Sequence, residues 1–122
     1  MAKNHSAEFV ALVEAARRHV TEVSVDEVLA RRGSSFSLVD VREDGEWQAG
    51  HAEGAIHLGR GVLERDVVQR FPDKATPLVL YCGGGFRSAL AAESLQKMGY
   101  TNVRSMAGGW SEWLERGGPT AR

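Results

Sequence analysis

The sequence predicts a single α/β domain built around a parallel sheet. Apolar runs of strand length alternate along the chain with segments of helical periodicity, which is typical of α/β folds. The runs at 36–41 and 77–81 are nearly continuous in apolar residues, as expected of strands that are covered on both faces. A length of 122 residues corresponds to one domain, since domains usually hold ~100–200 residues.

Composition and charge exclude several classes of protein. Hydrophobic residues make up 43% of the chain and charged residues 25%, so a sizeable core is expected and disorder is not. The formal net charge of −1 disfavours a general nucleic-acid binder, which would carry a basic excess. Residues 1–10 include charged and polar side chains and no long apolar run, so we expect neither a secretory signal nor a membrane span.

Two helices are expected before the first strand. The segment 1–20 has apolar residues at helical spacing and Ser6 as a suitable N-cap, and its apolar face would pack on the domain or form a dimer or partner surface. The residues on that face are Phe9, Val13, Ala16 and Val20. A second, short helix starts at Ser24, which forms a capping-box pattern with Glu27, and Gly33 is its expected stop.

The rest of the chain continues the alternation of strands and helices. Further strands are expected at 55–58, where the signal is weaker, and at 102–106. Helices are expected at 63–71, from the glycine-rich loop after residue 82 to about residue 98, and at 110–116. Pro72 and Gly99 mark the ends of the first two of these helices.

The only cysteine lies where an α/β fold forms its functional sites. Cys82 directly follows the strand 77–81 and precedes a helix, and sites in open α/β sheets form at the carboxyl ends of strands. Gly83, Gly84 and Gly85 have no side chains to block the backbone N–H groups of this loop, so the loop can form a cradle for an anion. These surroundings favour a thiolate, and Arg87 adds a cation. Cys82 is therefore the candidate nucleophile.

Other interpretations of this loop explain less of it. An inert, buried cysteine does not explain why three glycines and Arg87 follow it. Gly83-x-Gly85-x-x-Ser88 approximates a dinucleotide fingerprint but lacks its third glycine and its acidic partner, and a Walker loop would need Gly-Lys-Ser/Thr. A cysteine phosphatase is the main alternative, although phosphatase loops have five residues between cysteine and arginine and this loop has four.

Three motifs together resemble the single-domain members of the rhodanese family of sulfurtransferases. CGGGFRS at 82–88 resembles the family's six-residue loop from cysteine to arginine, followed by serine. LVDVR at 38–42 and EWxxGHxxGAIH at 46–57 resemble its amino-terminal signature, and GGWxxW at 108–113 resembles its carboxy-terminal one.

The resemblance implies a fold, a reaction and a set of site residues. The fold is a five-stranded parallel sheet with helices on both faces; an N-terminal helical extension spans 1–22 and the rhodanese-like domain spans 23–118. A donor such as thiosulfate gives its outer sulfur to Cys82, and the resulting persulfide passes it to a thiol or cyanide. Cys82 is implied as the catalytic residue, and no metal or organic cofactor is expected. The implied substrate-binding residues are Arg42, Gly83, Gly84, Gly85, Phe86, Arg87 and Ser88.

Two positions depart from the family pattern. Gly83 stands where relatives that favour thiosulfate often have a basic residue, which leaves the identity of the donor open. Gly59 stands where a proline is usual.

Asp40 and Arg42 suit two interpretations: they could form a buried structural ion pair, or Arg42 could contact the substrate.

The other polar and aromatic residues of the motifs are expected to be structural. Glu46 and His51 would fix a loop, and His51 and His57 lack partners at metal spacing, so zinc is not expected. Trp110 and Trp113 lie one helical turn apart and are expected in the core.

A protein of another class would use the same loop. A persulfide carrier or interaction module would receive sulfur from one protein and pass it to another without turning over small donors. The expected partners are a small sulfur donor and a thiol, cyanide or protein acceptor, without nucleic acid or membrane, and the chain would be a monomer or a homodimer. We expect a cytoplasmic location, because a single cysteine fits a reducing compartment.

Overall fold

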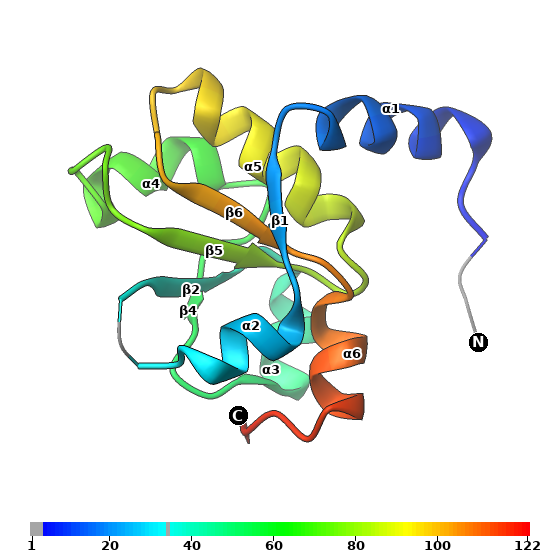
Figure 1. Cartoon of the computed structure of the whole chain (residues 1–122), viewed down its shortest axis with the longest axis vertical. Coiled ribbons are helices and arrows are strands. Elements are labelled where there is room, and N and C mark those ends of the chain that lie inside the picture. The colour runs from blue at the N-terminus through cyan, green and yellow to red at the C-terminus, as the bar shows by residue number, and fades with distance from the viewer. Residues whose placement is uncertain (1–3, 34) are drawn as a thin grey trace.

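The central sheet has five parallel strands, which confirms the expected architecture (Figure 1). The computed structural model describes residues 4–33 and 35–122. In spatial order the strands are β1 (Thr21–Val23), β6 (Val103–Met106), β5 (Leu78–Tyr81), β2 (Ser37–Asp40) and β4 (Ile56–His57). β5 is the middle strand, so Cys82, which follows it, lies at the centre of the carboxyl edge of the sheet.

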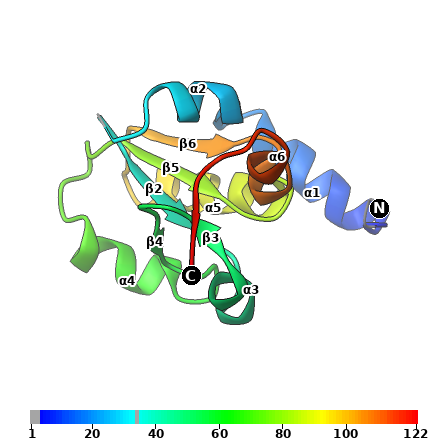
Figure 2. The ribbon, with the colours of Figure 1, turned by 90° about the horizontal axis from the view of Figure 1, so that it is seen from below.

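Helices cover both faces of the sheet (Figures 1 and 2). α4 (Leu63–Arg70) and α5 (Phe86–Lys97) pack on one face, and α2 (Val25–Ala30) and α6 (Gly109–Glu115) pack on the other. α1 (Ala7–Arg17) packs against α5. None of the helices in the described part of the chain is long and apolar enough to cross a membrane.

Alternate strand residues contribute to two separate cores. In β5, Leu78 and Leu80 pack with α4 and α5, whereas Val79 and Tyr81 pack with α2 and α6. Successive side chains of a strand point to opposite faces, so both faces of β5 are apolar and buried. This burial on two sides is the physical reason for the continuous apolar run at 77–81.

The amino-terminal helix is held on the domain through its centre. Val13 and Ala16 are fully buried, while Phe9 and Val20 are half-buried, so the expected apolar face is confirmed in its middle and less complete at its ends. Ser6 Oγ accepts a hydrogen bond from the Phe9 N–H at 3.1 Å, which is the expected cap. The helix spans Ala7–Arg17, so residues 4–6 and 18–20 of the expected segment are not helical, and positions 1–3 lie outside the described residues.

Several short elements were not expected from the sequence. β1 has only three residues, and Thr21 and Glu22 are exposed, so it has no apolar run to predict it. The boundary expected between residues 22 and 23 falls within this strand. α3 (Asp44–Ala49) and the antiparallel pair of β3 (His51–Ala52) with β7 (Thr120–Ala121) also depend on contacts rather than on periodicity. α2 begins with the expected capping box but ends three residues before Gly33.

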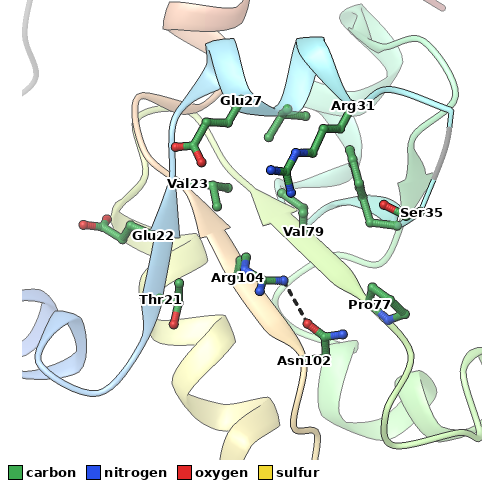
Figure 3. A pocket seen from close by; sticks show the side chains of 12 residues that line it. Thr21, Glu22, Val23, Glu27, Arg31, Ser35, Pro77, Val79, Asn102 and Arg104 are labelled. Atoms are coloured by element: carbon green, nitrogen blue, oxygen red, sulfur yellow. Dashed lines mark hydrogen bonds between the residues drawn. The ribbon is translucent and has the colours of Figure 1, made fainter.

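A groove of about 500 Å³ lies between α2 and the sheet (Figure 3). Pro77 and Asn102, which directly precede β5 and β6, line it together with Arg104, whose guanidinium donates to the Asn102 side chain at 2.8 Å. The groove therefore opens toward the amino ends of the strands, away from Cys82. Since ligand sites of parallel sheets form at the carboxyl ends, the candidate site lies at the other end of the sheet.

Candidate active site

The thiol of Cys82 is buried beneath the loop that joins β5 to α5. Its side chain is 1% exposed, and its Sγ accepts hydrogen bonds from the backbone N–H groups of Gly85 at 3.1 Å and Ser88 at 3.4 Å. Ser88 Oγ lies 3.6 Å from the sulfur and shares a 2.8 Å hydrogen bond with Ser105 Oγ. These N–H groups belong to the start of α5, so the sulfur lies where a helix stabilises negative charge.

The loop keeps its shape because α6 docks directly on it. The Trp110 N–H donates to the Cys82 carbonyl at 2.8 Å, and the Ser111 N–H donates to the Gly83 carbonyl at 3.0 Å. This close approach requires glycine at position 109: its φ is +53°, and a Cβ there would overlap the Cys82 carbonyl oxygen and come within 2.9 Å of the Gly83 carbonyl. The GGWxxW motif therefore supports the candidate catalytic loop, residues 82–88, from the next helix.

Arg87 at the end of the loop is paired with a carboxylate. Its guanidinium donates to both oxygens of Glu46, at 2.8 and 3.1 Å, and Glu46 also accepts a hydrogen bond from the Glu43 N–H at 3.0 Å. The hydrogen bond from Arg87 lowers the pKa of Glu46 from its ordinary 4.5 to about 2. Glu46 does fix a loop, as expected, but it does so by joining α3 to the catalytic loop, and it compensates the charge of Arg87.

This pair gives a measurable pH dependence. Because the folded-state pKa of Glu46 lies below its ordinary value, its contribution to stability is fully present above pH 4.5 and is lost as the pH falls toward 2. We expect Glu46→Gln to be less stable than the wild type at neutral pH, and the difference to shrink between pH ~5 and ~3. Denaturant unfolding of both proteins across that range measures it. A stability difference that stays constant with pH would show that the carboxylate charge is not what stabilises the contact.

Arg42 forms a buried ion pair with Asp40, which is one of the two alternatives expected from the sequence. Its guanidinium contacts both oxygens of Asp40, at 2.8 Å for the closest pair, and donates to the Gly50 carbonyl at 2.7 Å, with both charged side chains nearly inaccessible. Burial opposes the charge on Arg42, but the Asp40 carboxylate outweighs this and raises the pKa of the guanidinium. Its guanidinium carbon also lies 4.7 Å from the centre of the Trp110 ring. The ion pair does not remove Arg42 from the site, since it still lines the cavity described next.

A cavity of about 660 Å³ opens at the catalytic loop. Of the expected site residues, those that line it are Arg42, Cys82, Gly83, Gly84, Phe86 and Arg87. The other two, Gly85 and Ser88, lie at the sulfur, to which both donate from their backbone. Lining residues that sequence reasoning did not assign to the site are His5, Phe9, Glu46, Trp110 and Ser111.

The two tryptophans of the last helix have different surroundings. Trp113 is fully buried in the core under α2, as expected. The expectation of a core position holds only in part for Trp110, which is half-buried and packs against the edge of the same core cluster. Its ring also faces Arg42 at the level of the catalytic loop and lines the cavity. One sequence feature could have indicated this position: Gly108 and Gly109 directly precede Trp110 and come shortly after the end of β6.

The histidines of the EWxxGHxxGAIH motif pack beside Trp47 and are not among the residues that line the cavity. Trp47 stacks on His51 and His57, with ring centres 3.4 and 4.9 Å apart, and His57 Nε2 lies 2.9 Å from the Arg42 carbonyl oxygen. Within residues 4–33 and 35–122, no three His, Cys, Asp or Glu side chains are close enough together to hold a metal ion.

Comparison with known proteins identifies the family. A model of the rhodanese-like domain matches residues 24–116. The protein belongs to the rhodanese-like family. The thiosulfate sulfurtransferase GlpE of Shewanella oneidensis is 36% identical over 81 residues, which are 66% of this chain and 78% of GlpE. The uncharacterized protein YqhL of Bacillus subtilis is 37% identical over 76 residues, a match that spans 62% of this chain but only 59% of YqhL.

Solved structures of similar proteins agree with this membership. A Rhodopseudomonas palustris protein of unknown function, described as a possible tyrosine phosphatase, has a TM-score of 0.83 at 27% identity, with 99% of each chain covered. The homodimeric polysulfide-sulfur transferase of Wolinella succinogenes has a TM-score of 0.78 at 29% identity over 94% of this chain and 88% of its own. The first likeness includes α1, which the rhodanese-like domain model does not cover.

Proposed function

We propose that this rhodanese-like protein is a sulfurtransferase that carries sulfane sulfur as a persulfide on Cys82. The observation that carries the proposal is the position of the sulfur: Cys82 lines the cavity, and its Sγ accepts hydrogen bonds from the Gly85 and Ser88 N–H groups at the start of a helix. Family membership and the relative named thiosulfate sulfurtransferase support the same activity.

The reaction has two half-reactions. The Cys82 thiolate attacks the outer sulfur of a donor such as thiosulfate; the sulfur–sulfur bond of the donor breaks, sulfite leaves with the bonding electrons, and Cys82 becomes a persulfide. An acceptor thiolate or cyanide then attacks the outer sulfur of this persulfide, and the Cys82 thiolate is the leaving group. No external oxidant or reductant is needed, and one covalent intermediate gives ping-pong kinetics.

The loop residues have separate roles in this mechanism. The backbone from Gly83 to Ser88 holds the outer, negatively charged sulfur of the persulfide, since it combines a glycine-rich turn with the start of α5. Arg87 and Arg42 attract an anionic donor to the cavity, although each of them is already paired with a carboxylate. The pairing reduces the net charge available to the donor but keeps both guanidinium groups in fixed positions.

Intact-mass measurement after incubation with candidate donors tests the proposal. Thiosulfate, inorganic polysulfide and a small organic persulfide are offered separately, and we expect at least one to add a single sulfur to the protein. The added sulfur must be removed by a reducing thiol and must be absent from Cys82→Ser. A wild-type protein that gains no sulfur from any donor would overturn the proposal.

The same protein preparations distinguish the proposed enzyme from two alternatives, a persulfide carrier and a phosphatase. A persulfide carrier would load sulfur but would not complete repeated turnovers with small donors and acceptors, whereas an enzyme would. The Rhodopseudomonas palustris neighbour makes phosphatase activity the second candidate. We expect no turnover of an aryl phosphate ester, because the loop holds four residues between Cys82 and Arg87 where phosphatase loops hold five.

Replacement of the loop cation distinguishes charge from shape. We expect Arg87→Ala to lower kcat/KM for thiosulfate by roughly tenfold or more, since charged hydrogen bonds contribute about 1.5–3 kcal/mol. Phe86→Leu keeps the charge and changes the shape of the same loop. Steady-state kinetics of both variants, with unfolding curves as the control, give the comparison. Unchanged kinetics in Arg87→Ala, or a much larger loss in Phe86→Leu, would contradict a role for the charge.

A further inference from the structure

An aromatic cluster from the amino-terminal segment stands over the catalytic loop. The ring of His5 lies 4.6 Å from that of Phe86 and 5.1 Å from that of Phe9, and the rings of Phe9 and Phe86 are 6.0 Å apart. All three side chains line the cavity that contains Cys82. We call His5, Phe9 and Phe86 the aromatic wall. Two of its three members come from outside the region that matches the family model, residues 24–116.

The aromatic wall is fixed in place by the packing of α1. Val13 and Ala16 are fully buried, and α1 lies against α5, whose first residue is Phe86 (Figure 1). The Arg17 guanidinium lies 4.9 Å from the centre of the Phe86 ring, a distance at which a cation and an aromatic face attract. The amino-terminal helix therefore holds an aromatic residue of the catalytic loop from outside the sheet.

The charges of the cavity hold an anionic donor in place but do not select a small inorganic anion as the acceptor. Arg42 is matched by Asp40 and Arg87 by Glu46, each with a closest contact of 2.8 Å, so the two pairs are neutral together. The rest of the lining includes the aromatic wall and the half-buried ring of Trp110. A cavity of about 660 Å³ has the size of sites that hold organic ligands, and thiosulfate or cyanide would leave most of it empty.

We infer that the aromatic wall selects the sulfur acceptor, and that this acceptor is an organic thiol with an aromatic or other flat apolar group. The inference rests on the proposed sulfurtransferase function. The thiolate of the acceptor attacks the persulfide on Cys82, while its apolar group packs on Phe9, Phe86 and His5. An acceptor without such a group reaches the sulfur but makes no contact with the wall.

Acceptor selectivity measures this contribution. Benzyl mercaptan and 2-mercaptoethanol are compared as acceptors for sulfur already loaded on Cys82, because both are primary thiols and the first carries a phenyl ring where the second carries a hydroxymethyl group. We expect the wild type to prefer benzyl mercaptan, and Phe9→Leu and His5→Ala each to lower the ratio of the two kcat/KM values about two- to tenfold, through KM. Leu12→Ala is the matched control: Leu12 is on the same helix, is 57% exposed and does not line the cavity, so the ratio stays at the wild-type value.

The outcomes separate this inference from the function on which it rests. A protein that never loads sulfur fails the proposed function. A protein that loads and transfers sulfur, but with the same acceptor ratio in the wild type, Phe9→Leu and His5→Ala, retains the function and overturns the inference. His5 is exposed, so His5→Ala tests the wall even if Phe9→Leu loosens the packing of α1. Thermal unfolding of each variant checks that packing.

Discussion

We expect Cys82→Ser to abolish sulfur transfer and to leave the fold intact. Serine is nearly isosteric with cysteine, so its side chain fills the same buried space. Its oxygen can accept the same hydrogen bonds, so the N–H groups of Gly85 and Ser88 keep an acceptor. A hydroxyl, however, is hardly ionised at neutral pH and forms no persulfide. We expect transfer from every donor to fall to the uncatalysed background, with an unchanged far-ultraviolet circular dichroism spectrum.

The interpretation of this variant is unusually direct because the chain has one cysteine. No second thiol can take over the covalent step, so residual activity cannot be assigned to a substitute. Steady-state rates and intact mass after donor treatment are measured on the same sample. Transfer by Cys82→Ser at a substantial fraction of the wild-type rate would mean that the reaction does not pass through a Cys82 persulfide.

Gly109→Ala is expected to cause the largest loss of stability among conservative changes at this site. The added Cβ would overlap the Cys82 carbonyl oxygen and lie within 2.9 Å of the Gly83 carbonyl, and both belong to backbone that cannot rotate away. A non-glycine residue at φ +53° adds a further ~1–2 kcal/mol of backbone strain. With overpacking costs of ~1–3 kcal/mol, we expect a total loss of about 2–5 kcal/mol.

Gly117→Ala is the matched control for this prediction. Gly117 also has a positive φ, of +70°, but a Cβ there would meet nothing within 4 Å, so only the backbone strain applies. Denaturant unfolding of both variants therefore separates strain from overlap. If Gly109→Ala were no less stable than Gly117→Ala, the close contact between α6 and the catalytic loop would not be the reason for this glycine. We also expect Gly109→Ala to load sulfur poorly, because the overlap displaces the loop that carries Cys82.

The fold class and the candidate site around Cys82 follow from the amino-acid sequence alone. The apolar runs at 36–41 and 77–81 are local features, and burial on both faces of a strand is the direct cause of their composition. The Ser24–Glu27 capping box is likewise local, since both partners lie within one helical turn. The glycine-rich loop after β5 needs only the strand before it and the helix after it to place N–H groups at the sulfur of Cys82.

The residues that surround the Cys82 sulfur and its cavity depend on how distant parts of the chain pack together. Glu46 is 41 residues from Arg87 along the chain, and His5 is still farther from Phe86, so neither pairing leaves a periodic or spacing signal. Trp110 has the same helical spacing from Trp113 as a core residue would, and only the docking of α6 on the loop turns its ring toward Arg42. Periodicity records which side of an element is buried, whereas the partners across a cavity are set by how separate elements pack, and packing depends on the whole chain.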